Sequence, residues 1–211
     1  EAHRLASYMS MATSLKPDAD GNLTVARVRG SYGGNRTDYT GRRQANTASM
    51  AAVKTLMNAV VSDPTAKCMC ADAKNFYLMT VLDKYEYMWI DRAQIPDATF
   101  VKYNLDSKQT NSKGQYMVRV KRGMYGLPHA GRLAMIKVTK LLAKAGYHEC
   151  KLNKMVFRHA TKAIVFTLVV DDFMVKYTNR EDAEDLMRTL EEVYVMKTDW
   201  AAEKYLGITL D

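Results

Sequence analysis

The sequence predicts an α+β fold with the split βαβ order of ferredoxin-like proteins, which is strand, helix, strand, strand, helix, strand from residue 67 onward. Two observations support it. Apolar residues recur at helical spacing in two segments, and two β-branched runs flank a pair of aspartates like the arms of a hairpin. The expected elements are a strand at 67–72, a helix at 130–145, hairpin arms at 163–170 and 173–177, a helix at 181–193 and a strand at 204–210.

The part before residue 67 predicts a short strand at 23–29, then a polar, glycine-containing loop with the sequence SYGGNRTDYTGRRQ. Its glycines match neither the Walker nor the dinucleotide-binding pattern. Helical spacing predicts a helix at 50–61, with Thr47 and Ser49 as candidate caps. We therefore expect an N-terminal part at 1–66 and a main part at 67–211, within one domain overall.

The boundaries of the later elements follow from local residues. A polar stretch at 91–114 predicts a loop insertion, followed by a strand at 115–120. Gly146 ends the helix at 130–145. Asn179 caps the helix at 181–193, whose early carboxylates suit the positive end of the helix dipole.

Composition predicts a globular chain with an anionic partner. Of the 211 residues, 47% are hydrophobic, which is enough for a packed core, and the apolar run at 163–170 is far shorter than the ~20 residues of a membrane span. We expect no membrane segment and no signal peptide in these residues. The net charge of +8 suits nucleic acid, an acidic protein or a membrane surface, and a solvated basic face is an equal alternative.

The three cysteines, Cys68, Cys70 and Cys150, cannot all pair, and their spacing does not match a zinc site. We expect reduced thiols in an intracellular protein. Cys68 and Cys70 share one face of the predicted strand, which favours small core residues over metal ligands.

Asp171 and Asp172 interrupt the apolar run FTLVVDDFMVKY. Adjacent carboxylates repel, and Asp has low β propensity, so something must compensate for them. One interpretation is the tip of a hairpin, because Asp tolerates turn geometry. The other is a pair of hard oxygen ligands for a divalent cation.

Asp72 favours the second interpretation. The first strand and the central hairpin of a split βαβ sheet are usually neighbours, so Asp72 can approach Asp171 across 99 residues of sequence. Three carboxylates at one sheet edge suit two Mg²⁺ ions and in-line phosphoryl transfer. A basic surface that holds a polyanion would fit the same chemistry.

Four blocks of the sequence resemble, in order, those of the reverse transcriptase domain of copia-type long-terminal-repeat retrotransposons. They are CADAKNFYL at 70–78, KRGMYGLPHAGRLA at 121–134, LVVDDFMVKY at 168–177 and DWAAEKYLGITL at 199–210. Each block is weak alone, and four in order are specific. The resemblance covers about 23–210 and implies a right-hand polymerase, with partial fingers at 1–66, a ferredoxin-like palm at 67–211 and no thumb.

The resemblance also implies an RNA-directed DNA polymerase that adds a deoxynucleoside triphosphate to a primer on an RNA or DNA template, with Mg²⁺ or Mn²⁺. Asp72, Asp171 and Asp172 match its catalytic, metal-binding aspartates, and Tyr77 matches the aromatic residue that rejects a 2′-hydroxyl. An ordinary half-buried tyrosine is the alternative for Tyr77. The other implied residues are Tyr125, Gly126, Pro128, His129, Arg27 and Arg29 for the nucleotide and template, and Tyr205, Leu206 and Gly207 for the primer grip.

Two departures from the family are visible. His129 stands where the family usually has Gln, and no thumb, ribonuclease H or integrase region follows, so such regions of a polyprotein are expected to be missing here. Lys197 is either a proton donor to pyrophosphate or a solvent-facing lysine. The alternatives to a polymerase are an inactive mobile-element remnant that binds nucleic acid and a generic RNA-binding module. The family implies a cytoplasmic location, in a virus-like particle, or a nuclear one.

Overall fold

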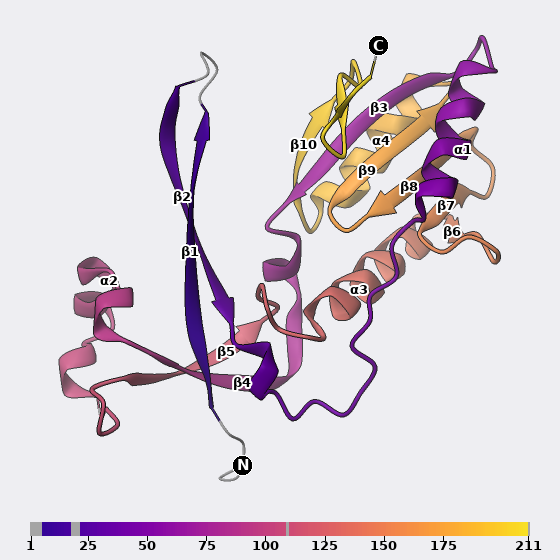
Figure 1. Ribbon diagram of the computed structural model, residues 1–211. Helices are drawn as coiled ribbons and strands as arrows, with labels where there is room; N and C mark the ends of the chain where they lie inside the picture. Colours follow the sequence, from indigo (N-terminus) through magenta and orange to yellow (C-terminus); the bar gives the residue numbers. More distant parts are fainter. Residues whose placement is uncertain (1–5, 18–21, 109, 211) are drawn as a thin grey trace. The chain divides into compact units, whose positions relative to one another are not determined.

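A computed structural model describes residues 6–17, 22–108 and 110–210, and the chain divides into two compact units (Figure 1). Unit 1 comprises Glu1–Arg43 and Val81–Ala130, and unit 2 comprises Gln44–Thr80 and Gly131–Asp211. The chain therefore passes from one unit to the other three times along the sequence. The helix at 50–61 belongs to unit 2, together with most of the expected main part.

Unit 2 contains a six-stranded sheet in the order β10-β3-β9-β8-β7-β6, in which all neighbours are antiparallel. The strands are β3 (Lys67–Lys74), β6 (Tyr147–Glu149), β7 (Val156–His159), β8 (Ile164–Val169), β9 (Asp172–Tyr177) and β10 (Val195–Asp199). The part β10-β3-β9-β8 has its first strand between the last and the third, which is the split βαβ order that the sequence predicts.

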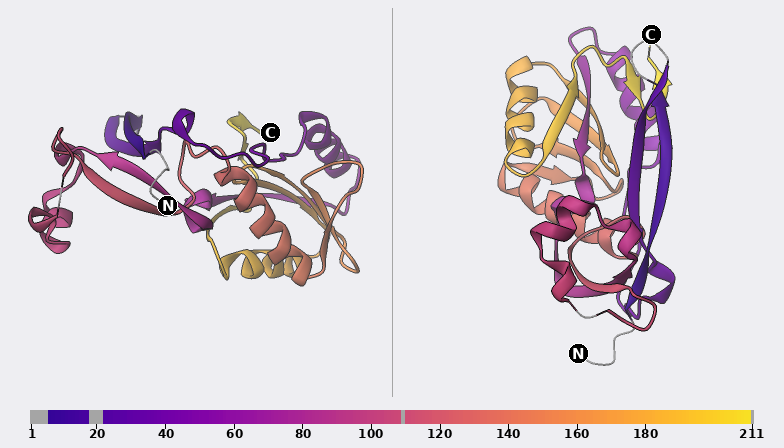
Figure 2. Two further views of the ribbon diagram at one scale, coloured as in Figure 1. Left: turned by 90° about the horizontal axis from the view of Figure 1, so that it is seen from below. Right: turned by 90° about the vertical axis from the view of Figure 1, so that its left-hand side faces the viewer.

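Three helices cover this sheet: α1 (Met50–Val61), α3 (Ala130–Lys144) and α4 (Arg180–Glu191). Helices α3 and α4 lie on one face, and α1 lies on the other (Figure 2). The Ser49 side chain caps α1 by accepting from the Ala52 N–H at 3.2 Å. The Asn179 side chain accepts from the Glu181 N–H at 3.1 Å, which confirms the predicted cap of α4.

The two faces of the sheet differ because side chains alternate along each strand. The centre of the face toward α3 and α4 is apolar and buried, with Met69, Phe166, Phe173 and Val175 at 0% exposure. The opposite face carries Cys70 and Asp72 from β3, Asp172 from β9 and Thr167 from β8, as the residue pairing shows. The polar groups therefore project on the side away from α3 and α4.

The last strand of the sheet differs from the prediction. It is β10 at Val195–Asp199, whereas 204–210 forms a separate hairpin of β11 (Lys204–Tyr205) and β12 (Ile208–Thr209). Positive φ angles of 51° at Leu206 and 80° at Gly207 allow the two-residue turn. The sequence VMKTD of β10 lacks clear alternation, and pairing with β3 is what makes it a strand.

The turn of the central hairpin is also shifted by one residue from the predicted pair of aspartates. Val169 pairs with Asp172, so the two turn residues are Val170 and Asp171. Val170 has a φ of 60°, a conformation that costs a β-branched residue energy.

Unit 1 contains a four-stranded sheet in the order β2-β1-β4-β5. Its strands are β1 (Ser7–Pro17), β2 (Leu23–Tyr32), β4 (Val81–Ile90) and β5 (Tyr116–Arg122). Strands β1 and β4 were not anticipated.

The predicted loop at 91–114 holds α2 (Asp97–Lys102). Phe100 of this helix is buried, and the Arg92 guanidinium carbon lies 3.9 Å from the centroid of the Phe100 ring. The 3-10 helices are η1 (Gly34–Arg36), η2 (Phe76–Met79), η3 (Arg92–Gln94) and η4 (Leu105–Ser107).

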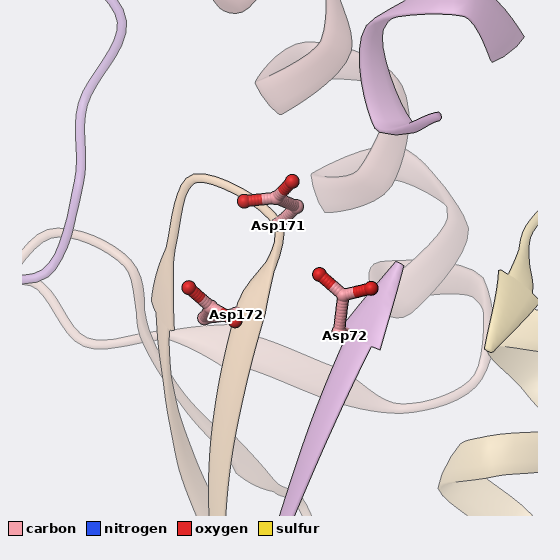
Figure 3. Close-up of side chains that lie close together, drawn as sticks. All are labelled: Asp72, Asp171 and Asp172. Carbon is pink, nitrogen blue, oxygen red and sulfur yellow. The ribbon is translucent and has the colours of Figure 1, made fainter. Parts of the chain in front are cut away.

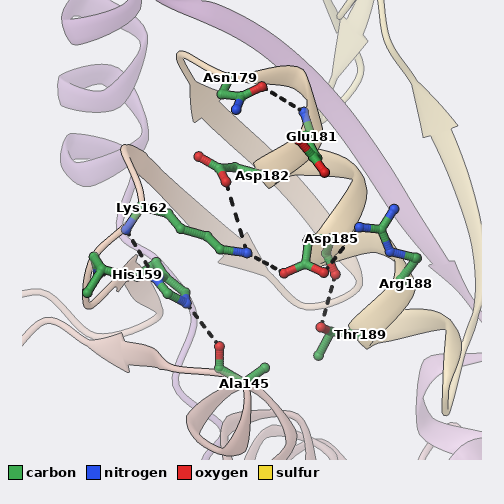
Figure 4. Close-up of polar contacts among 10 residues, drawn as sticks. Ala145, His159, Lys162, Asn179, Glu181, Asp182, Asp185, Arg188 and Thr189 are labelled. Carbon is green, nitrogen blue, oxygen red and sulfur yellow. Dashed lines mark hydrogen bonds and ion pairs between the residues drawn. The ribbon is translucent and has the colours of Figure 1, made fainter.

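A polar network fixes the turn between β7 and β8 in unit 2 (Figure 4). The Nδ1 atom of His159 accepts hydrogen bonds from the N–H groups of Thr161 and Lys162, both at 3.1 Å. Because Nδ1 accepts, the proton of the neutral ring lies on Nε2. The Nε2–H group donates to the Ala145 carbonyl at 3.1 Å. The Lys162 ammonium bonds to Asp185 of α4. The end of α3, this turn and α4 are thereby held together.

Within the described ranges, no helix is long and apolar enough to cross a membrane.

Candidate metal centre

Three carboxylates meet at one end of the unit 2 sheet (Figure 3). Asp72 near the end of β3 pairs directly with Asp172 at the start of β9, and Asp171 lies in the adjoining turn. One oxygen from each of the three lies within 4.8 Å of the others. The Ala73 N–H also donates to the Asp171 carbonyl at 2.9 Å, which ties the end of β3 to the turn.

The electrostatics of this cluster favour a cation. All three aspartates are half-buried, and burial raises the pKa of Asp172 to about 6, with further increases from the charges of Asp171 and Asp72. Ionised carboxylates so close together destabilise one another unless a positive charge compensates. Carboxylate oxygens are also the ligands that Mg²⁺ and Mn²⁺ prefer, so the donor set fits a divalent cation.

A pocket of about 400 Å³ opens beside the carboxylates. Its lining includes Asp72, Asp172 and Cys70, together with Lys197, Lys204 and Tyr205. Lys197 is exposed and lies directly across from Asp72 in the β10–β3 pairing. The pocket therefore offers both acidic and basic groups to a ligand.

Tyr77 lies five residues after Asp72 in the same unit. It belongs to η2, which follows β3 after Asn75 turns the backbone with a φ of 57°. The ring is half-buried and packs against the hydrophobic core. A half-buried ring is compatible both with a residue that rejects a 2′-hydroxyl and with an ordinary half-buried tyrosine.

The predicted primer-grip residues form the β11–β12 hairpin. Tyr205 is 2% exposed, and burial raises the pKa of its phenol to about 12. Its hydroxyl lies 3.4 Å from that of Thr167 on β8, so Tyr205 anchors the hairpin to the face that carries Asp172. Gly207 is exposed and Leu206 half-exposed, so these two lie at the accessible tip.

Asp199 organises this hairpin, a role that is not among the sequence-based predictions. Its carboxylate accepts from the N–H groups of Ala201 at 3.2 Å, Glu203 at 2.7 Å and Lys204 at 3.3 Å. The signal was present, because an Asp that follows a strand can bond to backbone N–H groups ahead of it and start a turn.

The remaining predicted residues lie in unit 1. The Arg29 guanidinium lies 5.2 Å from the Tyr125 ring centroid, and Gly126 has a φ of 80°. His129 is only 4% exposed, and its ring stacks on Tyr39. Arg27 lies in β2 opposite Ser14, and its side chain is outside the described part of the chain.

Comparison with known proteins identifies the family. The family described as reverse transcriptase (RNA-dependent DNA polymerase) matches residues 74–211, which is well over half of the chain and includes Asp171 and Asp172. No curated protein matches. A solved structure of telomerase from Candida albicans with a fragment of telomeric RNA is similar at a TM-score of 0.40 and 10% identity, over 77% of this chain and 32% of that one. The present chain thus spans about a third of the telomerase chain. The match over 74–211 shows that this chain belongs to the reverse transcriptase (RNA-dependent DNA polymerase) family.

Proposed function

We propose that the chain catalyses template-directed addition of deoxynucleotides to a primer, with Asp72, Asp171 and Asp172 as the catalytic, metal-binding residues. The observation that carries this proposal is the meeting of the three carboxylates within 4.8 Å. In the reaction, the primer 3′-hydroxyl oxygen attacks the α-phosphorus of a deoxynucleoside triphosphate, and pyrophosphate leaves.

Two Mg²⁺ ions, or Mn²⁺ in their place, would activate the attacking hydroxyl and neutralise charge on the leaving pyrophosphate. The role of the chain is to fix three ligands. Asp72 and Asp172 are fixed by direct strand pairing, and Asp171 is fixed by a two-residue turn whose carbonyl bonds to β3. Such preorganisation avoids the cost of gathering charged ligands during the reaction.

Lys197 is proposed as the proton donor to the leaving pyrophosphate. Its support is its position across from Asp72 and its place in the lining of the same pocket as Asp172. A lysine ammonium can give up a proton to a phosphate oxygen.

Nucleotide-contacting roles are proposed for residues in each unit. In unit 2, Tyr77 would press against the sugar and reject a 2′-hydroxyl. In unit 1, Arg27 and Arg29 would contact the triphosphate or template, and Tyr125, Gly126, Pro128 and His129 would form the turn behind the incoming nucleotide. The exposed tip of the β11–β12 hairpin, Leu206 and Gly207, would contact the primer, with Tyr205 as its anchor.

Charge supports a nucleic-acid role for unit 1, which we propose as the fingers. It holds fifteen of the Lys and Arg residues against nine Asp and Glu, so six of the eight net positive charges lie there. Unit 2, with the split βαβ sheet, is proposed as the palm. Lys and Arg contacts with phosphates supply most of the non-specific affinity for nucleic acid.

Primer extension on poly(rA) with an oligo(dT) primer tests the proposal, with Mg²⁺ and with Mn²⁺. Asp171→Asn keeps the size of the side chain but removes its charge, so incorporation should fall at least about a thousandfold. Glu191→Gln, which neutralises an exposed carboxylate at the end of α4, is the matched control and should keep full activity. Equal incorporation by the parent and Asp171→Asn would refute the assignment.

The competing candidate is a remnant that binds nucleic acid without polymerising. Fluorescence anisotropy of a labelled template–primer, measured on the same proteins, distinguishes the two. Tight, salt-dependent binding by a parent protein that adds no nucleotide with either metal would favour the remnant. A template–primer affinity that changes neither with Mg²⁺ nor with the Asp72→Ala substitution, again without nucleotide incorporation, would favour a generic RNA-binding module.

A further inference from the structure

A glycine-containing segment at 32–41 wraps the turn at 125–129 within unit 1. The Tyr32 N–H donates to the Tyr125 carbonyl at 2.7 Å. A Cβ on Gly126 would lie 2.2 Å from the Tyr32 carbonyl oxygen, and a Cβ on Gly34 would lie 2.1 Å from the Gly126 oxygen and 3.1 Å from the ring of Pro128. Two backbones in such close contact require glycine at both positions. Among the glycines of SYGGNRTDYTG, Gly34 thus serves packing against this turn.

Near its C-terminal end, the segment at 32–41 contacts His129 through Tyr39. The rings of Tyr39 and His129 are stacked, with centroids 4.1 Å apart and planes 12° apart, and His129 is 4% exposed. Tyr39 is itself held in place. Its carbonyl accepts from the Arg43 Nη2 at 2.9 Å, and the Gly41 backbone lies so close that a Cβ there would be 2.5 Å from the Tyr39 hydroxyl oxygen.

These contacts bear on the residue that departs from the family pattern. A residue that is only 4% exposed and whose ring stacks on a tyrosine is fixed by its neighbours within the protein. Stacked aromatic rings attract each other beyond the burial of their area, so Tyr39 restrains His129 directly. His129 is continuous with Pro128 and Gly126, so a restraint on its ring limits motion of the whole turn.

We propose that Tyr39 is a positioning residue for nucleotide binding, which acts by stacking on His129 and thereby fixes the turn at 125–129. The inference rests on the proposed role of that turn in binding the incoming nucleotide. The proposal assigns a packing partner to His129, the residue that stands where the family usually has Gln. That partner is Tyr39, which holds the His129 ring by stacking on it. Loss of the stack releases the turn, and a mobile turn must be ordered again each time a nucleotide binds.

Steady-state kinetics of the full chain on poly(rA)·oligo(dT) test this proposal. Tyr39→Ala should raise the KM for dTTP about fivefold or more, change kcat less than about twofold and leave template–primer affinity unaltered. Tyr39→Phe keeps the ring and should stay within about twofold of the parent. Tyr103→Ala removes a tyrosine that is 60% exposed in the same unit and serves as the control.

The pairing itself is tested by a double substitution. If Tyr39 acts through His129, then Tyr39→Ala combined with His129→Ala should raise the KM no further than His129→Ala alone. Multiplied effects of the two substitutions would overturn the proposal. So would an unchanged KM in Tyr39→Ala, or a defect in Tyr39→Phe as large as in Tyr39→Ala.

Nuclear magnetic resonance separates this proposal from the proposed function, because it needs no incorporation. In the parent, the Tyr39 ring current should move the His129 ring protons upfield, and Tyr39→Ala should reverse that shift while Tyr39→Phe keeps it. The backbone amide signals of 125–127 should also move in Tyr39→Ala and remain in place in Tyr103→Ala. Unmoved His129 signals in Tyr39→Ala would overturn the proposal even if polymerase activity is confirmed.

Discussion

The hydroxyl groups of Thr167 and Tyr205 lie 3.4 Å apart inside unit 2, and the two residues are 0% and 2% exposed. This contact joins the central strand β8 to the hairpin proposed to hold the primer. It lies on the same face of the sheet as Asp172, because Thr167 and Val169 share a face and Val169 pairs with Asp172. The contact therefore anchors the hairpin, through one buried hydrogen bond, on the face of the sheet that carries Asp172.

Removing either hydroxyl should destabilise the protein. Tyr205→Phe and Thr167→Val should each lower the free energy of unfolding by about 1 kcal/mol, since each leaves a buried hydroxyl without its partner. The double variant should lose less than the sum, because both polar groups are then absent. Urea denaturation of the four proteins measures this, and strictly additive losses would contradict the contact.

The raised pKa of Asp172 predicts a pH dependence of stability. Its pKa rises from 3.8 to about 6 on folding, so between these values the folded state binds more protons than the unfolded state. The contribution of this group to the free energy of unfolding is therefore present below about pH 4 and lost as the pH rises to about 6. For a half-buried carboxyl the loss should be roughly 1 kcal/mol after allowance for solvent screening.

The measurement is the difference in free energy of unfolding between the parent and Asp172→Asn, taken in denaturant without divalent cations from pH 4 to 7. Subtraction removes the opposing contributions of acids such as Asp63, whose pKa is lowered to about 2 by its bonds to Lys176 and Thr65. The parent should lose stability relative to the variant as the pH rises. A constant difference across this range would refute the prediction.

Neutralising Asp72 should uncouple stability from metal binding. Without metal, Asp72→Asn removes one of three repelling carboxylates and should raise the melting temperature by a few degrees. With Mn²⁺, the parent should gain stability by mass action and the variant should gain much less. Calorimetry with and without Mn²⁺ tests this, and an equal gain in both proteins would place the metal elsewhere.

Val170 should be a strained position. Its φ of 60° is unfavourable for a β-branched residue and ordinary for glycine. Val170→Gly should therefore leave the free energy of unfolding unchanged or raise it by up to about 1 kcal/mol, since relief of strain offsets the added chain entropy. Val169→Gly, the neighbouring residue within β8, is the control and should lower it by about 1 kcal/mol or more. Similar losses in both variants would exclude strain at Val170.

Two glycines with similar backbone angles allow a test of steric contact. Gly146 and Gly207 have φ angles of 86° and 80°. A Cβ added to Gly146 would lie 2.8 Å from the His159 Nε2, whereas a Cβ added to Gly207 would have no atom within 4 Å. Gly207→Ala should cost about 1 kcal/mol of stability from backbone strain alone. Gly146→Ala should cost at least about 1 kcal/mol more, and equal losses in thermal denaturation would refute the difference.

Local sequence was sufficient for much of the fold. The helices at 50–61 and 130–145 were predicted nearly to the residue, because apolar spacing, the Ser49 cap and Gly146 all act within a few residues of the chain. The central hairpin was predicted for the same reason. Its turn was misplaced by one residue because Val at a positive φ contradicts local propensity.

Long-range pairing decided the rest. The strand β10 and the sheet of unit 1 depend on partners far away in the sequence, which local propensity cannot identify. The stack of Tyr39 on His129, 90 residues apart, gave no local signal for the same reason.

The residues of the candidate metal centre were thus determined by the sequence, in the spacing of Asp72 and the pair Asp171–Asp172 and in the order of the four blocks. The tertiary structure alone decided that Asp72 stands directly opposite Asp172 and that Tyr205 lies buried beside Thr167. The physical reason is register: a shift of one residue between β3 and β9 would turn the Asp72 side chain to the opposite face of the sheet.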